Sequence, residues 1–273
     1  MGTRLIRCIS AVFVGVVGWQ LMAAPAAQAA NYALQFKGGN TNSQAESGDF
    51  VDLGFTLDVF PRGAKTIEFW CKPVKHSFSN MVFGLQDPAF LATRSYLDDN
   101  NCAGSLRFYS NGAAAATITN VIVYDKVQHI AIVDTGAALR IYRDGQQVGT
   151  ANVTWVVHPT NASRPSMQIG RGLHSGGGRY FQGWMDELRI WNTARTPAEI
   201  QATMKQELGG DEAGLVGYWN FNEGSGTTAY DNSPSQKHGK VVGATWITEA
   251  APVAPVLVAS NPVPANGTVG VPR

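Results

Sequence analysis

Short runs that alternate apolar and polar residues follow one another from Asn31 to Ile247, and they constrain the fold more than any other feature of the chain. Examples are "KTIEFWCKPV", "QHIAIVD" and "WMDELRIWN". A period of two residues gives a strand one apolar face, and turn residues separate the runs at short intervals. The pattern predicts an all-β sandwich. Within it, "LRIYRDGQQVGT" predicts a tight hairpin, because Asp144 and Gly145 suit the positive φ angles of such a turn.

One helix is predicted to interrupt the strands. Thr196 is followed by Pro197 and, three residues on, by Glu199, which is the pattern of a capping box. An apolar stripe then recurs every four residues, at Ile200, Met204 and Leu208, and Gly209 and Gly210 predict the end of the helix. We expect this helix to close one end of the sandwich and to serve packing, not ligand binding.

Residues 1–30 have the pattern of a secretory signal peptide. Arg4 and Arg7 precede the apolar run "ISAVFVGVVGWQLM", and the small residues of "AAPAAQAA" suit cleavage after Ala29 or Ala30. The alternative is a membrane anchor that stays in place, but the run is shorter than the roughly 20 apolar residues that a spanning helix needs. We therefore expect a protein that is secreted or held in the cell envelope, with no membrane span once the signal is removed.

Removal of the signal takes Cys8 away and leaves Cys71 and Cys102. Two cysteines in an oxidising compartment favour one disulfide, which would stabilise the fold by roughly 3–4 kcal/mol in the chain-entropy model. The alternative is two buried thiols that do not meet.

Residues 248–273 are rich in Pro and Ala, and within them residues 248–257 predict a linker. The stretch "PVLVASNPVPANGTVGVP" resembles the opening strand of bacterial immunoglobulin-like domains, so further modules could follow downstream. A disordered tail is the other interpretation.

The charge of the chain excludes one large class of function. Its 21 basic and 20 acidic residues give a net charge of +1, and the bases form no long run, so the electrostatic footprint of a nucleic-acid-binding protein is absent. The five histidines show no zinc-binding spacing.

Several phrases together resemble one family. They are "YALQFKGG", "GDFVDLG", "TIEFWCKP", "HIAIVDTGAALRIYRDGQQVG", "FQGWMDELRIWNTARTPAEI" and "GLVGYWNFNEGSGTTAYDNSPSQKHGKVVGATW". They are similar to the laminin-G-like jelly-roll modules of the concanavalin-A-like lectin/glucanase superfamily, in its pentraxin-like branch, over residues 31–247. The resemblance implies a two-sheet antiparallel jelly-roll sandwich with one short helix, and an extracellular role in recognition or adhesion.

The resemblance also implies a role for Asp186, which would fasten the oxygen-rich loop of residues 38–49, with calcium as the cofactor between them if a metal binds. Asn40 and Asp49 are the further ligand candidates in that loop. Lys37 stands where family members often carry an acid, which weakens the case for calcium. A carboxylate that ties the loop by hydrogen bonds alone is the alternative.

Catalysis requires acids in a suitable arrangement, and the sequence argues against it. Alternation predicts that Asp186 and Glu187 point to opposite faces of their strand, so they cannot serve one sugar as a pair, and Glu187 is expected to bind Arg189 or Arg195. No E-x-D-x-x-E strand occurs. A polysaccharide lyase needs a base such as histidine, and the nearest candidate is His129. The resemblance implies that His129 has a structural role instead.

Aromatic rings that stack on sugars are the other candidates for a site. Four tryptophans lie within predicted strands and are expected mostly in the core: Trp70, Trp191, Trp219 and Trp246. Trp155, Tyr180 and Trp184 lie in or beside predicted loops, and we select them as ligand-binding candidates. The sequence thus predicts a secreted, non-catalytic module that binds carbohydrate or an extracellular glycoconjugate. Its rivals are a polysaccharide-degrading enzyme of the same fold (a glycoside hydrolase or lyase) and a structural or protein-binding module.

Overall fold

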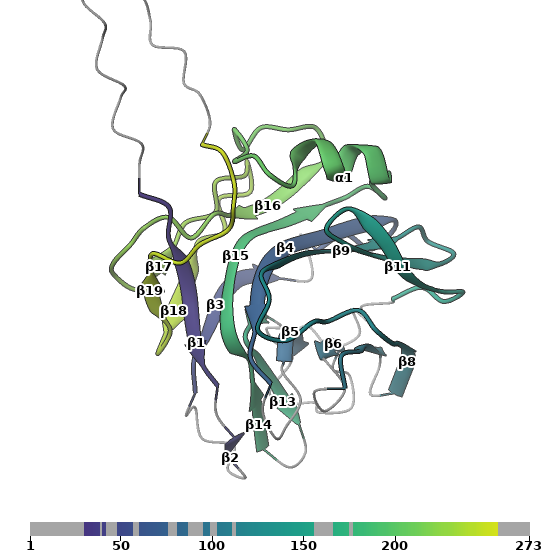
Figure 1. The fold of residues 1–273 in the computed structure, drawn as a ribbon, viewed down its shortest axis with the longest axis horizontal. Helices are drawn as coiled ribbons and strands as arrows, with labels where there is room; N and C mark the ends of the chain where they lie inside the picture. Colours follow the sequence, from purple (N-terminus) through teal and green to yellow (C-terminus); the bar gives the residue numbers. More distant parts are fainter. Residues whose placement is uncertain are drawn as a thin grey trace, which may run out of the picture.

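The computed structural model describes residues 30–38, 40–41, 48–56, 60–75, 81–86, 95–98, 103–110, 113–155, 166–174 and 177–255. Within these residues the chain forms two antiparallel eight-stranded sheets that lie face to face, with the one short helix α1 (Pro197–Thr203) on the outer side of the first sheet (Figure 1). The predicted two-sheet sandwich is therefore confirmed. The helix does not close an end of the sandwich as expected, because Ile200 packs on Ala131 and Val133, on the outer side of that sheet.

The first sheet has the strand order β11 (Gln146–Ala151), β10 (Leu139–Arg143), β9 (Gln128–Asp134), β4 (Lys65–Pro73), β15 (Gln182–Trp191), β1 (Ala33–Lys37) and β19 (Thr245–Ile247), and β16 (Leu215–Trp219) also pairs with β15. The predicted hairpin joins β10 to β11, with φ angles of 51° at Asp144 and 75° at Gly145. This turn is confirmed.

The second sheet has the order β17 (Thr228–Ala229), β18 (Gly239–Val242), β3 (Phe50–Thr56), β12 (Ser166–Ile169), β5 (Met81–Gln86), β6 (Ser95–Asp98), β7 (Leu106–Ser110) and β8 (Ala113–Ile118). A small third sheet joins β13 (Arg171–His174), β14 (Gly177–Tyr180) and β2 (Asn40–Thr41).

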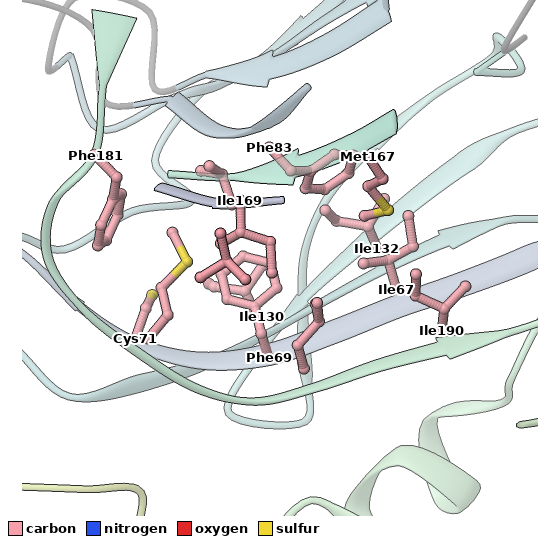
Figure 2. Close-up of a cluster of buried hydrophobic side chains, with 14 of the residues drawn as sticks. Ile67, Phe69, Cys71, Phe83, Ile130, Ile132, Met167, Ile169, Phe181 and Ile190 are labelled. Carbon is pink, nitrogen blue, oxygen red and sulfur yellow. The ribbon is translucent and has the colours of Figure 1, made fainter. Parts of the chain in front are cut away.

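The main core lies between the two large sheets. In Figure 2, Ile67, Phe69 and Cys71 of β4 lie opposite Met167 and Ile169 of β12, and all are buried. Removing one large aliphatic side chain from such a core costs about 2–5 kcal/mol.

The outer side of the first sheet is also covered, which explains why β4, β9 and β15 are buried along nearly their whole length. Three apolar clusters lie there, one under α1, one around Trp191 and Tyr218, and one around Trp70 and Trp184. Strands buried on both faces lose a clean alternation of apolar and polar residues.

Residues 248–255 form part of this cover, so the predicted linker is wrong for this segment, which we call the strap. Ala250, Ala251 and Val253 pack against Trp70 and Trp184. The backbone N–H of Ala254 donates to the carbonyl of Lys205, and the N–H of Glu207 donates to the carbonyl of Ala254. Small side chains allow this close approach to the two indole rings. Residues 256–273 lie outside the described part of the chain.

The predicted helix start is confirmed in detail. Thr196 caps the helix, its side chain accepts from the N–H of Glu199, and the Glu199 carboxylate accepts from the N–H of Thr196. The helix is shorter than expected and ends at Thr203, well before Gly209. Among the described residues, no helix is long and apolar enough to span a membrane. The proposed signal peptide lies outside these residues.

Candidate functional site

A β-bulge in β15 decides where the two neighbouring acids point. Asp186 pairs with Trp70, but Arg189 pairs with Glu68, so two residues of β15 lie opposite the single residue Phe69. Glu187 accommodates the extra residue of the bulge by adopting a positive φ of 53°. Met185 and Leu188, on either side of the two acids, both lie in the main core. The prediction of opposite faces is therefore wrong, because the bulge places Asp186 and Glu187 on the same outer side of the first sheet.

Glu187 sits in a buried network beneath the segment that follows α1. Its carboxylate accepts from Arg189 Nη2 and from the hydroxyl of Tyr218, at 3.0 and 3.1 Å to the two oxygens. Arg189 also donates to the carbonyls of Thr203 and Gln206. Burial raises the pKa of Glu187 to about 7, although Arg189 and Tyr218 act in the opposite direction. The predicted pairing of Glu187 with Arg189 is confirmed.

Glu68 and His129 extend this network along the same side of the sheet. Trp191 Nε1 donates to Glu68 Oε1 at 2.9 Å, and His129 Nε2 lies 3.6 Å from Glu68 Oε2. Burial, with a smaller contribution from Arg189 and Arg195, lowers the pKa of His129 to about 3, and burial raises the pKa of Glu68. Both side chains are at most 1% exposed. A sealed, neutral imidazole cannot act on a polysaccharide, so we assign this cluster to the scaffold, as the sequence predicted for His129.

Asp186 fastens the strap instead of the loop of residues 38–49. Its two carboxylate oxygens accept from the N–H groups of Ala251 and Glu187, both at 2.8 Å. Burial and the neighbouring Glu187 raise the pKa of Asp186 well above its usual range. The prediction of a tie to the loop fails because the strap, which looked like a linker, occupies that side of β15.

The calcium candidates are not brought together. Asp49 accepts from the backbone N–H of Lys37 at 2.6 Å. Lys37 pairs with Gln182 and Leu34 with Met185, so Asp186 lies about four residues, or about 13 Å, further along β1. One calcium ion cannot bind both at ligand distances of about 2.3–2.6 Å. The side chain of Asn40 lies outside the described residues, which contain no group of three His, Cys, Asp or Glu that could hold a metal. Calcium stays a prediction.

The three aromatic candidates are buried, so their selection as ligand-binding residues is wrong for this conformation. Trp155 is 1% exposed and packs edge-on or tilted against Phe60, Phe83 and Phe108 in the main core. Trp184 is 1% exposed beneath the strap, and Tyr180 is fully buried. Trp70, Trp191 and Trp219 are buried as predicted, whereas Trp246 is only half-buried.

Of the two cysteines in the predicted disulfide, Cys71 lies among the described residues. Cys71 lies buried in β4 and forms no disulfide with another described residue, and burial raises the pKa of its thiol. Cys102 lies outside the described residues, so the Cys71–Cys102 disulfide stays a prediction.

The outer face of the second sheet is the candidate binding site that sequence reasoning missed. Five strand pairings place six residues in one line across β18, β3, β12, β5, β6 and β7, and we call this line the register row: Lys240, Asp52, Gln168, Gly84, Tyr96 and Tyr109. On the first three strands of the row, five of the six neighbouring residues belong to the main core, the exception being Gly239: Val51, Leu53, Met167, Ile169 and Val241. Alternation therefore directs these row positions away from the core.

The described side chains of the register row are polar. Lys240 is exposed, and Asp52 and Gln168 are partly exposed. Gln168 Oε1 is buried and has no hydrogen-bond partner. Gly84 carries no side chain and is buried. Tyr96 and Tyr109 are placed here by backbone register alone. Amide, carboxylate and ammonium groups in a line suit a ligand rich in hydroxyl groups.

Comparison with known proteins agrees with this architecture. Residues 27–201 match the Laminin_G_3 family model, described as the concanavalin A-like lectin/glucanases superfamily. No curated protein sequence matches the chain at a significant level.

Solved structures share the fold at low sequence identity. A protein from Bacteroides ovatus ATCC 8483, provisionally described as carbohydrate-binding, is 21% identical with a TM-score of 0.61, and the match covers 82% of this chain and 61% of that one. The CBM40 of the Ruminococcus gnavus IT-sialidase, bound to α2,3 sialyllactose, is 11% identical with a TM-score of 0.50, covering 62% of this chain and 95% of that one. A heptameric SAP-like pentraxin from Limulus polyphemus is 18% identical with a TM-score of 0.44, covering 64% and 82% respectively. At these identities the likeness concerns the fold alone.

Proposed function

Because the chain belongs to the concanavalin A-like lectin/glucanase superfamily, we propose that it is an exported, non-catalytic module that binds carbohydrate through the outer face of its second sheet. The register row is the observation that carries the proposal. It places three polar residues that are at least partly exposed, Lys240, Asp52 and Gln168, next to one another on a sheet face, whereas the outer face of the first sheet is covered by α1 and the strap. The Bacteroides protein and the CBM40, both with this fold, are described as carbohydrate-binding, which supports the same assignment.

The rival assignment to a glycoside hydrolase requires a pair of acids, and the described strands of this face carry no suitable pair. The eight strands of the second sheet carry two acids, Asp52 on β3 and Asp98 on β6. Three strand spacings separate them, which is about 14 Å. Retaining enzymes need their carboxyl groups about 5–5.5 Å apart and inverting enzymes about 6.5–9.5 Å. These strands therefore offer no catalytic pair, and the acids on the outer side of the first-sheet strands, Glu68, Asp186 and Glu187, are buried.

A glycan array tests the proposal. The wild-type protein should bind at least one polysaccharide or oligosaccharide, and Asp52→Ala and Gln168→Ala should each weaken binding about threefold to tenfold, as expected for one lost hydrogen bond. Arg140→Ala is the matched control, since Arg140 is an exposed residue of β10 in the first sheet. Circular dichroism and melting curves confirm that all variants fold.

Three results would reject parts of the proposal. Absence of binding to every glycan would favour a structural or protein-binding module. Equal loss of binding in Arg140→Ala would place the site elsewhere. Release of reducing ends or unsaturated sugars from a polysaccharide would establish an enzyme. Export is tested separately, by the N-terminal sequence of the protein recovered outside the cytoplasm, which should begin at Ala30 or Asn31.

A further inference from the structure

An open pocket of about 410 Å³ lies at one end of the sandwich, where β4 and β8 end and β7 and β9 begin. We call it the end pocket, and its walls include Lys75, Gly104, Asn120, Ile122, Val123 and Tyr124. All of these residues belong to connections between strands, so the end pocket is separate from the register row. Its volume is within the range of small-molecule sites, about 300–1,000 Å³.

Hydrogen bonds of Gly104 hold two walls of the end pocket together. The carbonyl of Gly104 accepts from the N–H groups of Val121 and Ile122 at 2.8 and 3.0 Å, and its N–H donates to the hydroxyl of Tyr124. Gly104 has a φ of 72°, and a Cβ at this position would lie 3.1 Å from the carbonyl oxygen of Ile122. Walls that are fixed before binding reduce the conformational entropy that a ligand must overcome.

Apolar surface is concentrated beside the end pocket. Among the described residues, three large hydrophobic side chains are exposed, and two of them, Val123 and Val127, lie in the turn that forms one wall. The buried amide of Gln128 fixes this turn, because it accepts from the N–H of Val123 at 3.1 Å and donates to the carbonyl of Val123 at 2.6 Å. A concave surface with apolar walls and a few polar groups is typical of a ligand site.

Two polar side chains of the end pocket are available to a ligand. Lys75 and Asn120 are both exposed, and neither side chain has a hydrogen bond or ion pair to another described residue. Lys75 is also the only charged residue of the lining. An ammonium group binds a carboxylate more strongly than it binds a neutral acceptor, and an amide both donates and accepts. These groups suit a ligand that has a carboxylate and neighbouring hydroxyl groups.

We propose that the end pocket is a second ligand site, which binds a single sugar ring that carries a carboxylate, as in the uronic acids. The C–H face of the ring lies against Tyr124 and Val123, the carboxylate accepts from Lys75, and Asn120 bonds to a hydroxyl group. The site goes beyond the proposed function and does not depend on it, because it uses none of the residues of the register row.

Pairs of sugars that differ only in the carboxylate test the proposal. The probes are the methyl glycosides of glucuronic and galacturonic acid, each with its neutral parent, methyl glucoside or methyl galactoside, and acetate as a carboxylate without a ring. Amide NMR signals of Gly104 and of residues 120–124 are followed during titration. At least one uronide should bind with a dissociation constant on the order of 1 mM, and its neutral parent and acetate should each bind about tenfold more weakly.

Variants separate the two polar contacts. Lys75→Gln should weaken binding of the uronide about tenfold and leave the neutral parent within about twofold. Asn120→Gly should weaken both about threefold to tenfold, and glycine adopts the φ of 61° found at Asn120 without strain. Lys126→Gln is the matched control, since Lys126 is an exposed lysine outside the lining, and it should change neither.

Four results would overturn the inference: no binding of either uronide, equal binding of a uronide and its neutral parent, equal binding of acetate, and equal effects of Lys75→Gln and Lys126→Gln. None of them bears on the register row, which is tested by Asp52→Ala and Gln168→Ala on the array. Conversely, loss of array binding in those two variants, with uronide binding at the end pocket unchanged, would support both sites independently.

Discussion

Arg189 compensates two buried acids at once. It donates to the carboxylate of Glu187 and lies 3.8 Å from Glu68 Oε1, and all three side chains are buried. Removing one partner from such a group leaves uncompensated charge in a medium of low polarity. Arg189→Ala should therefore lower the free energy of unfolding by about 3–5 kcal/mol. Arg140→Ala, which removes an exposed arginine, should change it by at most about 0.5 kcal/mol. Urea unfolding measures both, and equal midpoints for the two variants would refute the scaffold role of the cluster.

Glu187 also makes stability depend on pH. Its pKa is raised from 4.5 to about 7 in the folded protein, chiefly by burial. Between these two values the folded state holds a proton that the unfolded state releases, so the free energy of unfolding should fall as pH rises through this window. The contribution is on the order of 3 kcal/mol. In Glu187→Gln this contribution is absent, so the variant should lose less stability than the wild type between pH 4.5 and pH 7.5. Urea unfolding at several pH values measures this difference. If the free energy of unfolding changes with pH by the same amount in the wild type and in Glu187→Gln, then Glu187 is not the group responsible.

At the scale of elements, the capping box sets the start of α1, the helix that covers Ala131 and Val133. Thr196→Ala removes the hydroxyl that accepts from the N–H of Glu199, and the free energy of unfolding should fall by about 1 kcal/mol. Thr196→Ser keeps the hydroxyl and should retain most of the wild-type stability. Thermal melting compares the two variants. If Thr196→Ser melts at the same temperature as Thr196→Ala, the hydroxyl does not stabilise the helix.

The same element shows what the sequence could predict. A capping box and the Asp144-Gly145 turn are encoded by residues within a few positions of one another, and both predictions are confirmed. The bulge at Glu187 has no such local signal, since glutamate is not a residue that favours a positive φ. Its position follows from the pairing of β15 with β4, which joins residues more than a hundred positions apart in the chain.

Burial of the aromatic candidates was unpredictable for a related reason. Trp184 is covered by Ala251, which belongs to a segment with the composition of a linker, and Trp155 enters the core from beyond the end of β11. The register row likewise depends on five strand pairings, none of which is visible in a local pattern. The sequence predicted the fold class and the individual turns because these depend on short periods. It could not predict the site, which depends on register.

At the scale of the whole molecule, the strap extends the folded unit beyond the boundary at Ile247 that the sequence predicted. A chain that ends at Ile247 should be less stable than one that ends at Pro255 by on the order of 3 kcal/mol, because Trp70 and Trp184 lose their apolar cover. The tryptophan emission of the shorter chain should also shift to longer wavelength. Identical unfolding curves and emission for the two chains would show that the strap contributes nothing to the fold.

The hydrogen bond from Asn31 Nδ2 to the carbonyl of Ala251, 2.8 Å long, brings the entry and the exit of the folded unit to one spot on the first-sheet side. Polypeptide attached before Asn31 and polypeptide attached after the strap would therefore leave the folded unit side by side, as two adjacent legs. The register row lies on the opposite side of the sandwich, on the outer face of the second sheet (Figure 1). Tethering through either leg would consequently turn that face toward free solution, so immobilisation at residue 31 and at residue 255 should leave it equally accessible.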